Sequence, residues 1–241
     1  MALEWFEALD NVRNFTFKII TPQGSGTGFL ITLREQNICG IATAYHVIDH
    51  AYSREEPIKL LQTATNKTLL LNAPDRYVFP NPANDAAIIM FMKGDLQVNT
   101  DLLALAPEDK YLKPGSKIAW AGYPVIAPDE CSFFSGHISC YLNVAKAYLV
   151  DGVAINGISG GPAFAIVGDS VQVIGSVSAY IPNRVTGECL PGVCFVTAVQ
   201  FFHEFIKDLD SLEDAKQEEG SAELVTVGSV VPAVTPRPHA A

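Results

Sequence analysis

The sequence predicts an all-β protein built in two halves of similar size. Short segments rich in β-branched and aromatic residues recur along the chain, separated by Gly, Pro, Asn and Asp. This spacing favours barrels or sandwiches over alternating strands and helices. With 241 residues, 49% of them hydrophobic, the chain can bury a large core in one domain or in two tightly joined halves.

Helices are expected at the two ends, where apolar residues recur at helical spacing in residues 3–13 and 197–206. Between them the expected strands are 15–21, 27–33, 38–44, 58–62, 68–72 and 86–92 in the first half, and 117–122, 136–141, 145–149, 162–167, 171–178 and 193–196 in the second.

Composition divides the chain into five parts. We expect an N-terminal extension over 1–14, a first β half over 15–98, a connector over 99–115, a second β half with the terminal helix over 116–210, and an acidic, then Pro-containing, disordered tail over 211–241.

The net charge and the hydropathy of the chain argue against two classes of partner, nucleic acid and membrane. The net charge is −10, with seven acids and two lysines between Lys207 and Glu223. An acidic chain without a basic stripe is a poor candidate for nucleic acid. No run approaches the ~18 apolar residues of a membrane span. We expect neither nucleic acid nor membrane as a partner.

The cysteines and the first residues bear on the cellular compartment. The five cysteines, Cys39, Cys131, Cys140, Cys189 and Cys194, follow no pairing pattern. The first residues lack a basic region followed by an apolar run. Both features favour reduced thiols and a cytoplasmic location, and one or two disulfides in a secreted enzyme are the alternative.

Three short segments far apart in the chain hold a His, an Asp and a Ser. They are residues 43–47 (Thr-Ala-Tyr-His-Val), 84–88 (Asn-Asp-Ala-Ala-Ile) and 156–162 (Asn-Gly-Ile-Ser-Gly-Gly-Pro). A serine hydroxyl is a poor nucleophile until a base takes its proton and a carboxylate orients that base. His46, Asp85 and Ser159 are therefore candidates for a catalytic triad.

The segment around Ser159 also fits the nucleophile elbow of α/β-hydrolases, Gly-x-Ser-x-Gly. That motif needs a helix after the serine and an acid and a His downstream. Here Pro162 and a β-rich stretch follow, and the downstream histidines are His203, in the expected terminal helix, and His239, in the expected tail. We reject the hydrolase interpretation.

Together with residues 24–31, 174–180 and 191–194, these motifs resemble the trypsin-like, chymotrypsin-fold serine peptidases, and in style their bacterial HtrA-like members. The resemblance covers residues 15–208. It implies two six-stranded antiparallel β-barrels with the site between them, a C-terminal helix, and a protein or peptide substrate. His46 is then the base, Asp85 its orienter and Ser159 the nucleophile, with no cofactor.

The resemblance also implies roles for neighbouring residues. The amides of Gly157 and Ser159 are the oxyanion donors, and Ser178 supports the triad carboxylate. The substrate pocket is then formed by Val153, Ala154, Tyr180 and Gly192. Because Val153 at the pocket base carries no charge, we expect a small-to-medium apolar residue on the acyl side of the cleaved bond (P1).

Ile158 and Val47 depart from the pattern of the zymogen-activated members. Ile158 stands where zymogen-activated members have an acid, so activation by N-terminal trimming is not expected. Val47 replaces the cysteine that follows their catalytic His. The alternatives left open are a peptidase gated by an activating protein partner and a catalytically silent binding module on the same fold.

A metal site is not expected. His50 follows His46 by four residues, a spacing that on a helix brings two imidazoles to one face, but no third ligand is evident. Asp49 is a competing acid, but it stands too close to His46 in the sequence for the family pattern.

Overall fold

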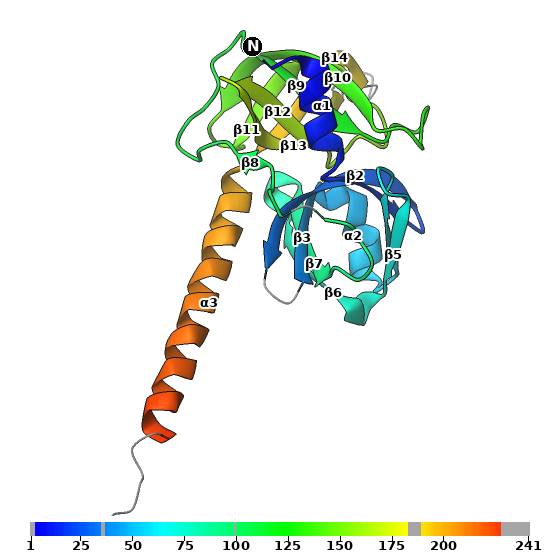
Figure 1. Cartoon of the computed structure of the whole chain (residues 1–241). Coiled ribbons are helices and arrows are strands. Elements are labelled where there is room, and N and C mark those ends of the chain that lie inside the picture. Colours follow the sequence, from blue (N-terminus) through cyan, green and yellow to red (C-terminus); the bar gives the residue numbers. More distant parts are fainter. Residues whose placement is uncertain (1–2, 35–36, 99, 183–188, 228–241) are drawn as a thin grey trace, which may run out of the picture. The chain divides into compact units, whose positions relative to one another are not determined.

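The computed structural model describes residues 3–34, 37–98, 100–182 and 189–227, without the side chains of 179–191 and 216–227. Its β structure forms two seven-stranded sheets, one from each half of the chain (Figure 1). The predicted all-β class is confirmed.

The first sheet is antiparallel, in the order β5-β4-β1-β2-β3-β7-β6. Its strands are β1 Thr16–Thr21, β2 Gly24–Arg34, β3 Ile38–Thr43, β4 Ile58–Gln62, β5 Lys67–Leu71, β6 Arg76–Asn81 and β7 Ala86–Met92. Alternate residues of these strands, such as Phe17 and Ile19 of β1, are buried in a common core.

The second sheet closes on itself, because β12 pairs with both β9 and β13. The barrel strands are β9 Lys117–Gly122, β10 Ser132–Leu142, β11 Ala147–Asp151, β12 Pro162–Val167, β13 Ser170–Pro182 and β14 Cys189–Ala198. The short strand β8, Ala104–Leu105, lies within the expected connector and pairs in parallel with β13.

The first sheet differs in detail from the expected closed six-stranded barrel. It has a further strand, β6, and no pairing between the described residues of β5 and β6 closes it. Sequence reasoning missed β6 because Pro80 interrupts it. Proline lacks an amide N–H, and an edge strand tolerates it because one side of that strand needs no partner.

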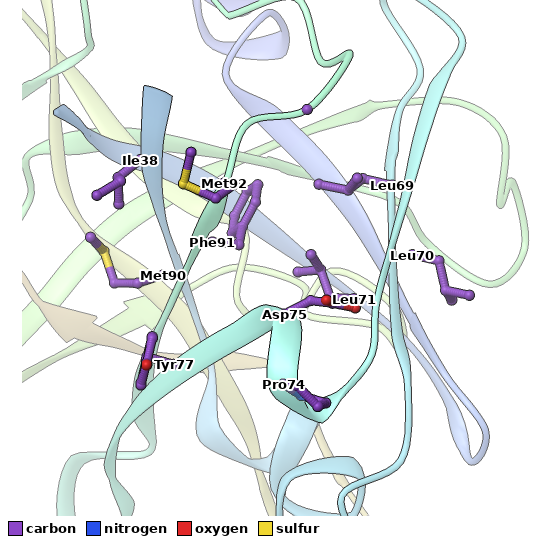
Figure 2. A pocket seen from close by; sticks show the side chains of 11 residues that line it. Ile38, Leu69, Leu70, Leu71, Pro74, Asp75, Tyr77, Met90, Phe91 and Met92 are labelled. Atoms are coloured by element: carbon purple, nitrogen blue, oxygen red, sulfur yellow. The ribbon is translucent and has the colours of Figure 1, made fainter. Parts of the chain in front are cut away.

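The open edge of the first sheet holds a cavity of about 560 Å³ (Figure 2). Apolar side chains from β3, β5, β6 and β7 surround it, among them Ile38, Leu69, Tyr77 and Met92. This cavity contains no residue of the candidate triad.

Helix α1, Trp5–Arg13, forms as expected, with its buried Ala8 and Val12 in one core cluster with Phe164 of the second barrel. Helix α2, Tyr45–Ser53, was not predicted from apolar spacing. Its β-branched and aromatic residues are weak helix formers, and its buried Ile48 and Ala51 pack into the core of the first sheet.

Helix α3, Gln200–Val227, runs beyond the expected 197–206 segment. Residues 211–227, expected to be disordered, are helical, which corrects that prediction. The segment is rich in Glu, Lys, Ala and Leu, all good helix formers. The rest of the expected tail, 228–241, lies outside the described residues. No described helix is long and apolar enough to cross a membrane.

The loop that carries Ser159 approaches the first sheet closely at Gly160. Its backbone has φ +82°, a conformation that favours glycine, and its amide donates to the carbonyl of Val177. A Cβ at this position would collide with the carbonyl oxygen of Thr27 and the hydroxyl of Thr43 in the first sheet.

We therefore expect Gly160→Ala to lower the free energy of unfolding by at least about 2 kcal/mol more than Gly115→Ala. Gly115 is a matched control, because its φ is +84° but a Cβ there would meet nothing within 4 Å. Denaturant unfolding measures both variants. Equal losses would contradict the close approach at Gly160.

Candidate active site

The structure brings His46 and Asp85 together although they lie on different elements. The Nδ1–H of His46, at the start of α2, donates to Asp85 Oδ2 at 2.8 Å, and the His46 amide donates to Oδ1 at 3.0 Å. Because a carboxylate only accepts, this contact keeps the proton on Nδ1 and leaves Nε2 as the acceptor nitrogen. His46 is thereby set up as a base.

Asp85 accepts a third hydrogen bond, at 2.6 Å, from the hydroxyl of Ser178 on β13 of the second barrel. Burial tends to raise the pKa of Asp85, but the hydrogen bonds from His46 and Ser178 outweigh it, so the pKa lies below its ordinary value. The side chain is therefore a carboxylate at neutral pH.

A tight turn before β7 presents Asp85. The 3-10 helix η3, Pro82–Asn84, ends at Asp85 in the left-handed conformation (φ 48°, ψ 48°), which Asp tolerates better than most residues. Thr197 of β14 fixes this turn to the second barrel by donating its hydroxyl proton to the carbonyl of Asn84 at 2.8 Å.

The hydrogen bond and charge of Asp85 also shift the pKa of the His46 imidazole. The hydrogen bond to Asp85 raises the pKa of His46 above its ordinary value, while burial works to lower it. The negative charges of Asp85 and Asp49 raise it further.

Ser159 lies in a loop in which some backbone amides donate hydrogen bonds and others do not. The amides of Ile158, Gly160 and Gly161 donate to backbone carbonyls. In the part of the chain that the structure describes, those of Gly157 and Ser159 donate to none. Gly157 has φ +95°, and a Cβ there would collide with the carbonyl oxygen of Tyr123. Two neighbouring free amides can stabilise a developing oxyanion.

Thr27 of β2 holds this loop against the first sheet. Its hydroxyl donates to the carbonyl of Gly157 at 2.7 Å and accepts from the amide of Tyr123 at 3.0 Å. Its own amide donates to the carbonyl of Ser159 at 2.8 Å. Sequence reasoning missed this role, because a threonine at a strand start is ordinary and its partner is 130 residues away in the chain.

Ser159 and His46 line one cavity of about 370 Å³, together with Gly157. Among the described residues, the Ser159 hydroxyl makes no hydrogen bond. Catalytic hydrogen bonds are often long in enzymes without substrate and tighten when substrate binds.

Val153, Ala154 and Gly192, three of the four expected substrate-pocket residues, do not line this cavity. Val153 is half exposed, and next to it the amide of Gly152 donates to the carbonyl of Gly192 at 2.8 Å. Ala154 is half-buried. Tyr180 pairs through its backbone with Cys194, and its side chain lies outside the described residues.

Ile158 is fully buried, and a Cβ on Gly122 would come within 3.2 Å of it. An apolar side chain therefore fixes the middle of the Ser159 loop, at the position where the sequence departs from the acid of zymogen-activated enzymes.

His50 and His46 do not share a ligand site. The Nδ1–H of His50 donates to Glu56 Oε2 at 3.0 Å. No group of three or more His, Cys, Asp or Glu side chains able to hold a metal occurs within the described ranges.

Solved structures of similar fold include two that are named as proteases. The serine endoprotease from Yersinia pestis has a TM-score of 0.63 and 14% identity, covering 87% of this chain and 67% of that one. Deg5 has a TM-score of 0.61 and 18% identity, covering 84% and 94%. The inactive form of the Rv3671c protease has a TM-score of 0.55 and 18% identity, covering 79% and 86%.

No protein-family model matches the sequence, and no curated protein matches it. At these identities the structural likeness shows the fold, and it confirms the expected chymotrypsin-like fold with its helix at each end.

Thr27→Val keeps the shape of this side chain but leaves the Gly157 carbonyl and the Tyr123 amide unpaired. We expect it to cost about 2–4 kcal/mol of unfolding free energy and to speed amide exchange in residues 155–161. Thr32→Val is the matched control, because Thr32 is also buried on β2 and makes no side-chain hydrogen bond within the described residues. Similar exchange in both variants would contradict the role given to Thr27.

Proposed function

We propose that this chain is a serine endopeptidase. One observation carries the proposal: a histidine oriented by a half-buried carboxylate lines the same cavity as Ser159, whose own amide and that of Gly157 are free among the described residues. That constellation performs acyl transfer on several unrelated folds, so the geometry of the site supports the proposal beyond the likeness of fold.

In the proposed mechanism, Ser159 Oγ attacks the carbonyl carbon of the peptide bond and its proton passes to His46 Nε2. The amides of Gly157 and Ser159 donate to the oxyanion that forms. His46 then gives the proton to the leaving amine, and water, activated by the same nitrogen, releases the acyl group. Asp85 holds the tautomer throughout and stabilises the imidazolium.

We further propose a small-to-medium apolar P1 residue, because Val153 offers no charge to a Lys or Arg side chain. The second candidate is a peptidase gated by a partner. The Ser159 hydroxyl that makes no hydrogen bond within the described residues supports it, because a partner that closes this contact would switch the enzyme on.

A peptide library with varied P1 tests the activity. We expect faster hydrolysis after Ala, Val or Leu than after Arg or Lys, and Ser159→Ala to lower kcat by about 10⁶-fold. Hydrolysis that survives Ser159→Ala would contradict the nucleophile, and fastest cleavage after Arg or Lys would contradict the P1 proposal. A folded wild type that cleaves only when a partner is added supports the gated form.

The pH profile tests the base. His46 accepts a proton only when neutral, so kcat/KM should fall as the pH drops through its raised pKa. Asp85→Asn removes the hydrogen bond and charge that raise this pKa. The fall of kcat/KM on the acid side of the profile (the acid limb) should therefore move to lower pH. In addition, kcat should fall by about 10⁴-fold. An acid limb at the same pH in both proteins would show that another group titrates.

A further inference from the structure

The cavity that holds His46 and Ser159 extends beyond the reacting groups, and on the side of the second barrel Val125 and Asn156 also line it. From His46 it continues along α2 to Asp49 and His50, and it also meets Gln23 and Ser25 of the β1–β2 hairpin. Val153, Ala154 and Gly192, expected in the pocket for the acyl side of the substrate, do not line it. Its volume of about 370 Å³ is within the range of ligand sites.

The chemistry of acyl transfer says which end of a peptide enters this cavity. The leaving amine takes its proton from His46 Nε2, so the nitrogen of the cleaved bond lies beside that ring. The residues that follow the cleaved bond continue from this nitrogen. The space bounded by His46, Asp49 and the β1–β2 hairpin is therefore next to the leaving side of the peptide.

The electrostatics of this space favour a cation. Asp49 is half-buried, and within the described part of the chain its carboxylate has no ion-pair partner; it accepts a hydrogen bond from the amide of His50 at 2.6 Å. The described lining residues include no Lys or Arg. Glu56 does not line the cavity, but it is hydrogen-bonded to the ring of His50, which does. It therefore adds a second carboxylate next to this space.

We infer that Asp49 is a specificity-determining residue that selects a Lys or Arg side chain at one of the first three positions after the cleaved bond. This inference rests on the proposed peptidase function. It predicts substrates that are apolar before the cleaved bond and basic after it. A half-buried, charge-assisted contact of this kind corresponds to roughly a tenfold preference.

Kinetics test the inference with fluorogenic peptides that share one apolar P1 residue and carry Lys or Glu at each of the three following positions. In the wild type, kcat/KM for the best Lys peptide should exceed that of its Glu twin by about tenfold. Asp49→Asn should bring the ratio near one and Asp49→Lys should invert it. The ratio cancels any effect of Asp49 on His46, which both peptides share.

The control variant is Glu55→Gln, which removes one negative charge from an exposed residue just after α2 that does not line the cavity. It should keep the wild-type ratio. A ratio near one in the wild type, or the same ratio in wild type and Asp49→Lys, would overturn the inference and leave the peptidase proposal standing.

A binding measurement separates the two proposals. With Ser159→Ala as background, fluorescence anisotropy compares the Lys peptide with its Glu twin, with and without Asp49→Lys. Tighter binding of the Lys peptide that reverses in Asp49→Lys supports the cation site even if the wild type hydrolyses nothing, which would overturn only the peptidase proposal. Equal binding of both peptides would overturn the cation site.

Discussion

The hydroxyl of Thr27 lies between the first sheet and the loop that carries Ser159, and both of its hydrogen bonds are made. A buried hydroxyl that donates and accepts at the same time is a directional constraint, because moving either partner leaves a polar group without a bond. It therefore sets how the two sheets meet. Gly157 and Gly160, which have no room for a Cβ, lie on either side of Ser159 at this contact.

The second constraint is the half-buried carboxylate of Asp85. Both oxygens of Asp85 are hydrogen-bonded, because the ring and amide of His46 and the hydroxyl of Ser178 all donate to them. Burial of an ionised carboxyl is tolerated when its oxygens are satisfied in this way. The first sheet supplies the carboxylate and α2 the imidazole, while the second barrel supplies the serine and the supporting hydroxyl. Neither half of the chain holds a complete site.

The sequence was informative where a residue type is rare in its context. An Asp before an apolar strand and a His after one are unusual enough to be noticed, and the Gly-rich segment around Ser159 requires special backbone conformations. Thr27 could not be found this way, because its role depends on a contact between sheets that no local pattern encodes. Ser178 was placed only through the family resemblance, since its role depends on strand register.

The limits of the fold prediction have similar causes. Helix α2 forms although its Tyr, Val and Ile residues prefer strands, because burial of Ile48 outweighs propensity. Strand β6 was missed because Pro80 is acceptable only at an edge. The helix beyond residue 210 was missed because an acidic segment was assumed to be unstructured, although its composition favours helix.

In the proposed mechanism, His46 and Asp85 activate Ser159 as a nucleophile. Intact-mass spectrometry after reaction with a fluorophosphonate, followed by peptide mapping, detects that activation. We expect one phosphonyl group per chain, on Ser159, absent from Ser159→Ala and formed much more slowly in Asp85→Asn. A folded wild-type chain that gains no adduct, or an adduct that persists in Ser159→Ala, would contradict this mechanism.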